Sequence, residues 1–407
     1  MKKTGTNYPL KFPGVVLCTT LFIGLFSRAV LAEGMDVYGT FTTDGAYSKL
    51  NPYSLTANAA DLNTYLGGDL YFQKKDENQI QYLMDLRLDG SLVDSQPFTL
   101  TVNQLYVMVP FSDQTFLYCG KKIKEIGVSN FFNVSNLLSP KYLFNNSYTR
   151  DGTGLLELDR IQSDVFSYGL ITNFQNAANW DQVQGVVFTD ARFGNFYLED
   201  YLYLQESAGS SLGLDATYQM GKYQLYLESI LKSWASRQVV LGNSGVPVDD
   251  FSVQELQNCP AVVLGGSITV DNFMAALEYF YNGNGYDASE QAAFMDYFKQ
   301  FPNQAANINN YYNRCTFTQN YLGLTLSQAN FLNKKVLTFN LSTLVSFQPG
   351  GDYQADTSYE VTTNLDYTFK QNLDFNFYLT YRNGGNYGEF NRLYSDLVLS
   401  LLINYNF

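Results

Sequence analysis

Apolar and polar residues alternate one by one in segment after segment of the chain, and this alternation limits the possible folds most strongly. In the closing segment, SDLVLSLLINYNF, Leu399, Leu401 and Ile403 fall on one parity, whereas Ser400 and Asn404 fall on the other. Period two predicts a β-strand with one apolar and one polar face. Eighteen segments carry the pattern: 34–48, 61–73, 78–90, 97–111, 114–124, 153–160, 163–174, 181–192, 195–205, 211–220, 222–232, 261–270, 272–282, 316–328, 335–348, 358–369, 372–382 and 395–407.

The connections between these segments fall into two classes. Every second connection is short and polar, as in KKDEN, FSDQ, ARFG and QMGK, which is typical of tight turns. The other set contains all the long ones, near 126–151, 234–258 and 283–314, with shorter ones near 92–97, 348–357 and 384–391. Segments of this length, an even count and loops segregated by length favour an antiparallel transmembrane β-barrel with short periplasmic turns and long extracellular loops.

Two alternatives remain at this point. The count falls to 16 strands if segment 153–160 and its neighbour belong to a loop. A secreted β-sandwich or solenoid shows the same period, but its polar face is the outer one and its loops do not segregate by length. Aromatic residues also gather at the expected membrane edges, for example Tyr218, Tyr223 and Tyr405 at one edge and Tyr359 and Tyr381 at the other, as in interfacial girdles.

The first 32 residues resemble a signal for export. A basic stretch, MKKTGTNYPLK, precedes an apolar run, and Val30, Leu31 and Ala32 offer small residues for cleavage. We expect 1–32 to be a cleaved signal peptide and 33–407 a single barrel domain; because Arg28 lies late, a retained N-terminal anchor is the alternative. Removal takes away four basic residues and no acid, which changes the net charge from −13 to −17. An acidic chain disfavours nucleic acid as a partner.

With its signal sequence, its alternating strands and a last strand that ends in the aromatic Phe407, the chain resembles the Gram-negative outer-membrane porins of 16 to 18 strands. The resemblance implies an outer-membrane location, a lipid bilayer around the barrel and passive diffusion of small hydrophilic solutes and ions. It also implies that the last strand, through Phe407, is recognised by the barrel-assembly machinery. Such porins often form homotrimers, and a monomer is the alternative.

A second likeness is local and concerns GKKIKEIGVSNFFNVSNLLSP, residues 120–140, after the fifth strand. Several porin families place a glycine and basic residues there, followed by a loop that folds into the lumen. By that analogy the segment 126–151 narrows the pore, and an external loop is the alternative. The constriction candidates are Asn133, Asn136, Ser139, Lys141, Asn145, Asn146 and Arg150.

The polar parities give candidates for the lining of the pore. The acidic ones are Asp85, Asp89, Glu157, Asp159, Asp215, Glu228, Glu278, Glu360, Asp366, Asp374 and Asp396, and the basic ones are Arg87, Arg160, Lys370 and Arg382. Such charges either pair across neighbouring strands and hold the wall together, or they select solutes. The acidic excess predicts a mild preference for cations or neutral solutes. Tyr106, Tyr226, Phe280 and Tyr378 are inward candidates that would suit sugar rings, which leaves a sugar-selective channel as an alternative.

Composition excludes several activities. The chain contains no histidine, so a Ser/His/Asp or Cys/His catalytic device and a histidine metal site are impossible. We therefore expect no enzyme, no cofactor and no metal site. Cys259 and Cys315 are predicted at the outer ends of two strands, and a disulfide between them would tie two long loops together. The competing function is a surface receptor or adhesin that binds ligands through its long loops.

Overall fold

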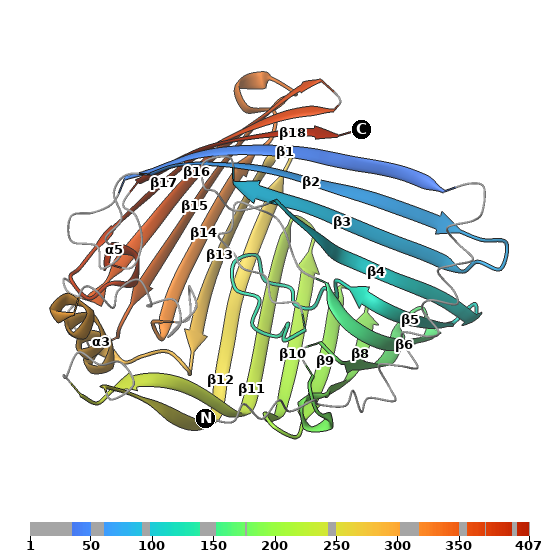
Figure 1. The fold of residues 1–407 in the computed structure, drawn as a ribbon, viewed down its shortest axis with the longest axis horizontal. Coiled ribbons are helices and arrows are strands. Elements are labelled where there is room, and N and C mark those ends of the chain that lie inside the picture. The colour runs from blue at the N-terminus through green and yellow to red at the C-terminus, as the bar shows by residue number, and fades with distance from the viewer. Residues whose placement is uncertain are drawn as a thin grey trace, which may run out of the picture.

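The computed structural model describes residues 35–49, 61–91, 98–138, 152–175, 177–242, 250–301, 317–349, 356–370, 372–392 and 397–406. These residues form one antiparallel β-barrel (Figure 1). The predicted signal peptide 1–32 lies outside the described residues. Within the described ranges, no helix has both the length and the apolar composition that crossing a membrane requires.

Eighteen strands make up the wall, which confirms the predicted number and rules out the alternative of sixteen. Their bounds are β1 Asp36–Lys49, β2 Asp61–Lys75, β3 Gln81–Ser91, β4 Thr99–Ser112, β5 Thr115–Lys122, β6 Thr153–Ser163, β7 Phe166–Asn173, β8 Gln184–Phe193, β9 Phe196–Gln205, β10 Gly209–Met220, β11 Tyr223–Val240, β12 Phe251–Val270, β13 Phe273–Asn282, β14 Asn320–Gln328, β15 Leu337–Phe347, β16 Ser358–Lys370, β17 Leu373–Gly384 and β18 Leu397–Asn406. The connections carry η1 Trp180–Gln182, α3 Ala288–Gln300, η3 Phe331–Asn333 and α5 Glu389–Arg392.

The first and last strands close the ring. Each strand pairs antiparallel with its neighbours in sequence, and β1 also pairs with β18 from Thr40 opposite Asn406 to Lys49 opposite Leu397. On the polar face of this seam, Thr42 donates a hydrogen bond to Asn404 at 2.9 Å and Ser400 donates one to Asp44 at 2.7 Å. Closure leaves no unpaired strand edge in the wall.

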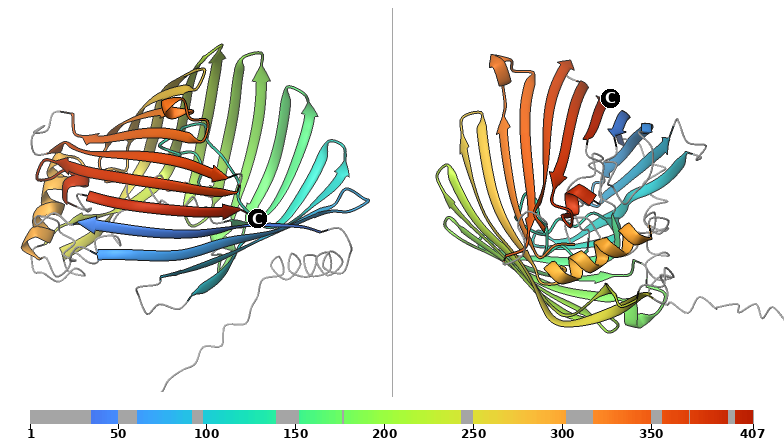
Figure 2. Two further views of the ribbon diagram at one scale, coloured as in Figure 1. Left: turned by 90° about the horizontal axis from the view of Figure 1, so that it is seen from above. Right: turned by 90° about the vertical axis from the view of Figure 1, so that its left-hand side faces the viewer.

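The two ends of the barrel differ as the sequence predicts. The connections after the even-numbered strands up to β16 are short turns, in which Gly194, Gly221 and Asp271 adopt the positive φ that two-residue hairpin turns require. The longer connections lie at the other end, where α3 and α5 also sit (Figure 2). We call these the turn end and the loop end.

The two faces of each strand lie in opposite environments. On β11, Leu225 and Leu231 are exposed, whereas Tyr226, Glu228 and Ile230 are buried. Exposed leucines, valines and aromatics recur on the same face of the other strands, and buried carboxylates on the opposite face. An apolar outer belt around a polar interior is the arrangement of a transmembrane barrel. Tyr218, Tyr223 and Tyr405 are exposed on the outer face near the turn end, as expected for a girdle.

One predicted loop is wrong in its extent. The segment 234–258 was expected to be a long connection, but Trp234–Val240 and Phe251–Gln257 continue β11 and β12 as a paired ribbon. This ribbon packs against α3 through an apolar cluster at the loop end that includes Val240, Phe251, Phe294 and Phe298. Asp287 and Glu290 form a capping box at the start of α3. The ribbon is therefore held by packing beyond the barrel wall.

Candidate functional site in the barrel interior

The connection after β5 enters the barrel. β5 has only eight residues, whereas its neighbours β4 and β6 have 14 and 11, so the chain leaves the wall before reaching the loop end. The following segment, 123–138, lies inside the ring of strands, where Figure 1 shows it in teal. We call this segment the inner loop. The rest of the predicted constriction segment, 139–151, lies outside the described residues.

A buried glutamate on β11 holds the first half of the inner loop. One carboxylate oxygen of Glu228 accepts hydrogen bonds from the backbone N–H groups of Val128, at 2.9 Å, and Ser129, at 3.0 Å. The other oxygen accepts from the N–H and hydroxyl of Ser135, at 2.9 and 3.1 Å. Asp215, opposite Glu228 on β10, also accepts from the Ser135 hydroxyl. Charged acceptors make these bonds stronger than neutral ones.

Glu278 on β13 holds the tip of the inner loop in the same way. Its carboxylate accepts hydrogen bonds from the backbone N–H groups of Asn130, Phe131 and Phe132, the latter two at 2.8 and 3.3 Å. The hydroxyl of Tyr226 donates a further bond at 2.6 Å. The loop N–H groups lack partners in a regular strand or helix, and the wall carboxylate satisfies them.

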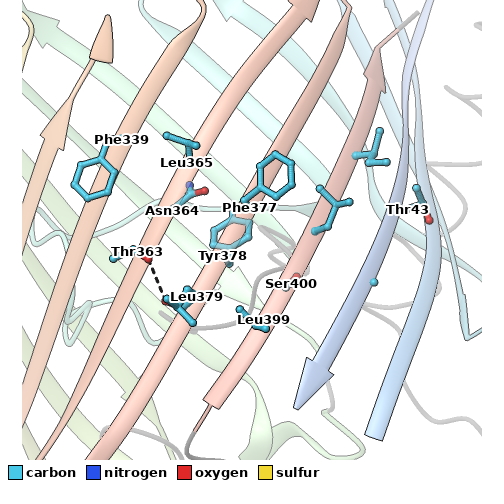
Figure 3. A pocket seen from close by; sticks show the side chains of 13 residues that line it. Thr43, Phe339, Thr363, Asn364, Leu365, Phe377, Tyr378, Leu379, Leu399 and Ser400 are labelled. Atoms are coloured by element: carbon cyan, nitrogen blue, oxygen red, sulfur yellow. Dashed lines mark hydrogen bonds between the residues drawn. The ribbon is translucent and has the colours of Figure 1, made fainter. Parts of the chain in front are cut away.

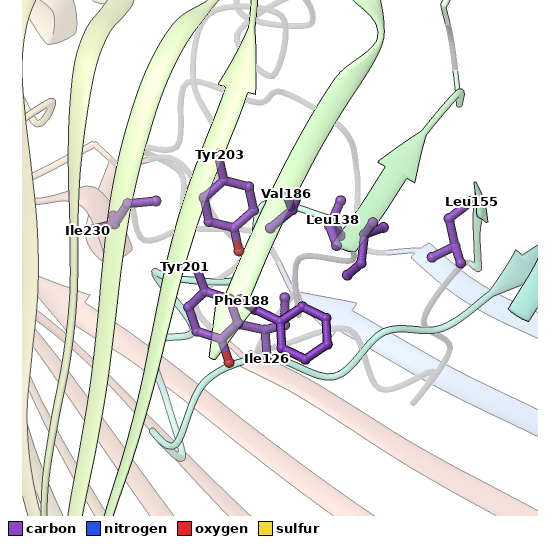
Figure 4. Close-up of a cluster of buried hydrophobic side chains, with 9 residues drawn as sticks. Ile126, Leu138, Leu155, Val186, Phe188, Tyr201, Tyr203 and Ile230 are labelled. Carbon is purple, nitrogen blue, oxygen red and sulfur yellow. The ribbon is translucent and has the colours of Figure 1, made fainter. Parts of the chain in front are cut away.

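Apolar side chains fill the space between the inner loop and the wall (Figure 4). Ile126 and Leu138 of the loop pack against Tyr201, Tyr203 and Ile230. On the other side, Phe131 and Phe132 pack against wall residues that include Phe280 and Tyr321. The loop is thus a packed layer on one side of the barrel.

Two lysines anchor the beginning of the inner loop. Lys122, the last residue of β5, lies 2.6 Å from a carboxylate oxygen of the fully buried Glu157, and Lys124 binds the other oxygen. Burial alone would lower the pKa of Lys124, but the nearby Glu157 and Asp159 hold that pKa above its ordinary value. These two lysines were not among the predicted site residues, because the sequence pattern did not indicate which wall acid they would meet.

The predicted pore-lining residues fall into three groups. Asp215, Glu228 and Glu157 bind the inner loop or its base, as does Glu278. Others pair within the wall: Arg87 with Asp69 at 2.9 Å, Arg382 with Glu360, and Asp85 with Asn103 at 2.6 Å. The remaining acids lie partly buried or exposed along the strands: Asp89, Asp159, Asp366 and Asp374. Asp396 lies outside the described residues.

Arg160 was expected to face inward and does not. It lies opposite Thr115 and Tyr168 in the register, on the face of the exposed Leu158, and its guanidinium donates to the Thr115 hydroxyl at 2.9 Å. Charged residues on the inner face that the sequence reasoning missed include Asp44, Asp69, Asp190 and Glu199. Their positions in the apolar–polar alternation of each strand could have identified them as inward-facing.

The constriction candidates among the described residues, Asn133 and Asn136, form their hydrogen bonds within the inner loop. The Asn133 side chain donates to the Ile126 carbonyl at 2.5 Å and accepts from the Asn136 N–H. Asn136 donates to the Lys124 carbonyl at 3.0 Å and accepts from the Leu138 N–H. Both asparagines stabilise the loop conformation. The other candidates, Ser139, Lys141, Asn145, Asn146 and Arg150, lie outside the described residues, as does Cys315, the predicted partner of the buried Cys259.

A hollow of about 620 Å³ lies elsewhere, across β15 to β18 and β1 (Figure 3). Much of its lining is apolar and outward-facing, including Phe339, Leu365, Phe377 and Leu399. It contains no charged side chain, so it lacks the chemistry to select a hydrophilic solute. The interior wall and the inner loop remain the candidate site.

Comparison with known proteins identifies the fold. No protein-family model matches the sequence, and no characterised protein matches it by sequence. Solved structures do match. One is OccAB1 of Acinetobacter baumannii, which has a TM-score of 0.61 and 9% identity, and the match covers 92% of this chain and 97% of OccAB1. The chain has the fold of an outer-membrane porin.

Two porins of Pseudomonas aeruginosa are similar to a comparable degree. For OpdL the TM-score is 0.59 and the identity 11%, and the match covers 92% of this chain and 99% of OpdL. OccK2, solved in complex with glucuronate, has a TM-score of 0.57 and 10% identity and covers 92% of this chain and 98% of its own. The porin fold therefore extends over nearly the whole chain, and the predicted resemblance to porins is confirmed at the level of the fold.

Proposed function

We propose that this protein is an outer-membrane channel for passive diffusion of small hydrophilic solutes. The observation that carries the proposal is the inner loop, which lies within the lumen of a closed barrel and is bound to its wall by buried carboxylates. A layer of this kind narrows a water-filled path without blocking it, and so limits the size of the solutes that pass. The apolar outer belt supports a place in the lipid bilayer.

We infer a mild preference for cations or neutral solutes. The inward-facing acids outnumber the bases among the predicted lining residues, and Arg87, Lys122, Lys124 and Arg382 each bind a carboxylate. Paired bases contribute little net positive potential, whereas acids such as Asp366 and Asp374 add negative potential along the path. Anions are then disfavoured by electrostatics alone.

Conductance in planar bilayers tests both statements. Stable open-channel steps are expected from the purified barrel, and their absence at every salt concentration and voltage would refute the channel. Under a potassium chloride gradient, the reversal potential should have the sign of a cation-selective pore. A reversal potential of the opposite sign would overturn the charge argument and leave the channel itself intact.

Export and assembly form a second part of the proposal. We expect cleavage after Ala32, recognition of the last strand by the barrel-assembly machinery through Phe407, and homotrimers. Support comes from β18, which presents alternate apolar residues such as Leu399 and Tyr405 on its outer face and closes the ring with β1. Replacing Phe407 with Ser should reduce the amount of folded barrel in the outer membrane, and chemical cross-linking of membranes reports the oligomeric state.

A receptor or adhesin is the second candidate function, and the packing of the ribbon against α3 at the loop end favours it. Arg237 of the ribbon binds Glu290 of α3 and lies 5.2 Å from the ring centroid of Tyr286. Gln291 of α3 donates to the Tyr387 carbonyl in the connection after β17 at 2.6 Å. These contacts join the ribbon, α3 and the connection after β17 into one packed surface, which suits recognition of a macromolecule. A barrel that binds a host surface but shows no conductance would establish this function instead.

A further inference from the structure

We propose that four tyrosines on the inner wall form a binding strip for the rings of carbohydrates. They are Tyr38 on β1, Tyr71 on β2, Tyr106 on β4 and Tyr118 on β5, and we call them the tyrosine strip. The inference rests on the proposed channel function and narrows its solutes to a class. It places a weak binding site on the wall of β1 to β5, toward the turn end.

The register places the four side chains on the inner face. Tyr38 lies opposite Tyr71, and Tyr71 lies opposite the buried Asp85 on β3. Tyr118 lies opposite Glu157, whose carboxylate binds the base of the inner loop. Residues directly opposite each other in an antiparallel pair share a face. Each of these tyrosines therefore faces the polar interior of the barrel.

The rings are arranged in two contacting pairs. Tyr38 and Tyr71 are stacked, with ring centroids 5.1 Å apart and an angle of 12° between the planes. Tyr106 and Tyr118 are tilted at 58°, with centroids 6.3 Å apart. Leu83, two residues before Asp85 on β3, lies opposite Tyr106, so the two pairs occupy the same inner face with β3 between them. Tyr38 is 43% exposed, so part of its surface is accessible to a solute.

Two other inward aromatics do not offer such a surface. Tyr226 and Phe280, which the sequence suggested for sugar rings, are buried beneath the inner loop, where Tyr226 binds Glu278 and Phe280 packs against Phe132. Their role is to support the loop. Among the tyrosines of the strip, by contrast, Tyr38 is exposed and Tyr71, Tyr106 and Tyr118 are only partly buried.

Hydrogen-bonding groups border the rings. Arg87 binds Asp69 at 2.9 Å beside Tyr71, and the Asp69 side chain is 19% exposed. At the other end, the Lys122 ammonium lies over the ring of Tyr118, 3.5 Å from its centroid, and marks the limit of the strip. Donors and acceptors are thus available next to flat apolar faces.

This combination fits a pyranose ring in particular. A pyranose has one face of C–H groups, which packs on an aromatic ring, and a rim of hydroxyls, which both donate and accept hydrogen bonds. An acyclic polyol has the same hydroxyls but no flat face. A small inorganic ion has neither. The strip should therefore distinguish ring-shaped from open-chain solutes of equal polarity.

Current block in planar bilayers tests the site. Maltose and glucose should interrupt the potassium current of the wild-type channel in a saturable way, and sorbitol should do so much less. Exchanging Tyr71→Leu keeps the apolar bulk and removes the flat ring, and we expect the half-saturating maltose concentration to rise about tenfold, the scale of one lost aromatic contact. Tyr71→Phe keeps the ring and should retain the block.

Tyr218→Leu provides a matched control, because Tyr218 is exposed on the outer face and should not affect the block. Equal block by sorbitol and glucose, or an unchanged block in Tyr71→Leu, would overturn the proposal while the channel function stands. Saturation-transfer NMR on the detergent-solubilised barrel adds a readout independent of conductance. It should show transfer to the ring C–H protons of maltose, and loss of that transfer in Tyr71→Leu but not in Tyr218→Leu.

If no conductance is found but the NMR transfer depends on Tyr71, the strip stands and the channel function fails. If the channel conducts and no transfer is seen, the strip fails alone.

Discussion

At the scale of single residues, buried carboxylates hold the inner loop in position. Glu228 and Glu278 each accept at least three hydrogen bonds from the inner loop, and both are fully buried. A buried charge is tolerated only when such bonds compensate for the water it has lost. The same carboxylates that make the interior acidic thus also hold the conformation of the loop.

Replacing Glu278 with Gln should loosen the inner loop. One amide nitrogen would then face backbone N–H donors, and the loss of charged acceptors costs about 1.5–3 kcal/mol for each bond. We expect higher single-channel conductance and more open-channel noise. Asp366→Asn is the matched control, since it removes one inner charge at a site bonded to Asn340 and not to the loop. The same conductance change in both variants would contradict the anchoring role.

An unusual acid lies on the outer face. Asp200 is at the middle of β9, on the parity of the exposed Leu202 and Leu204 and opposite Leu214 of β10. A carboxylate facing hydrocarbon destabilises a barrel, so Asp200→Leu should raise the free energy of unfolding in lipid by about 1–3 kcal/mol.

Asp190→Leu on β8 is the control for this substitution. Asp190 faces inward and accepts hydrogen bonds from Ser167 and Tyr197 at 2.8 and 3.0 Å, so its loss should not stabilise the barrel. Urea unfolding in phospholipid vesicles measures both variants. No gain in stability from Asp200→Leu would mean that the side chain is not in contact with lipid.

At the scale of elements, α3 depends on its N-terminal cap. The Asp287 side chain accepts from the Glu290 N–H at 2.9 Å, and the Glu290 side chain accepts from the Asp287 N–H. Partial burial acts to raise the pKa of Asp287, but hydrogen bonds to Glu290 and Ser289 outweigh it and hold the pKa below 3.8. A lowered carboxyl pKa stabilises the helix above that value, and the contribution is lost as the pH falls through the folded pKa.

Asp287→Ala should therefore destabilise α3 by about 1 kcal/mol. Hydrogen exchange of the α3 amides should be faster in this variant at neutral pH, and the wild type should approach it as the pH falls below 4. Asp287→Asn keeps a capping oxygen but cannot titrate, so its exchange should lack this acid dependence. Equal exchange in all three proteins would contradict the cap.

Local alternation predicted the strands well, because period two is a property of neighbouring residues. All eighteen predicted segments correspond to strands. The ribbon was missed because WASRQVV, residues 234–240, does not alternate cleanly and is held by packing on α3. Arg160 was misplaced because its charge was given more weight than its parity with Leu158. The loop contacts, such as Glu278 with Asn130, join residues 148 positions apart, which no local pattern encodes.

At the scale of the whole molecule, the seam between β1 and β18 decides whether the barrel closes. The register places Thr42 opposite Asn404, so a Thr42→Cys, Asn404→Cys double variant should form a disulfide, because opposite Cα atoms lie within bonding range. A Thr42→Cys, Ser400→Cys variant is displaced by four residues, about 13 Å along the strand, and should not cross-link. Non-reducing gels and mass spectrometry distinguish them, and cross-linking in the displaced pair alone would refute the register.

The early departure of β5 from the wall also has an electrical consequence. When conducting regions lie in series, the largest share of the voltage falls across the narrowest one. The inner loop narrows the path over a short length of the barrel, so most of the voltage falls across a thin layer. A charge on this layer, such as Glu125, would then sense most of an applied potential, at about 2.3 kcal/mol per 100 mV. Asp89, at the outer end of β3, would sense little. Voltage should act on this protein through one short segment.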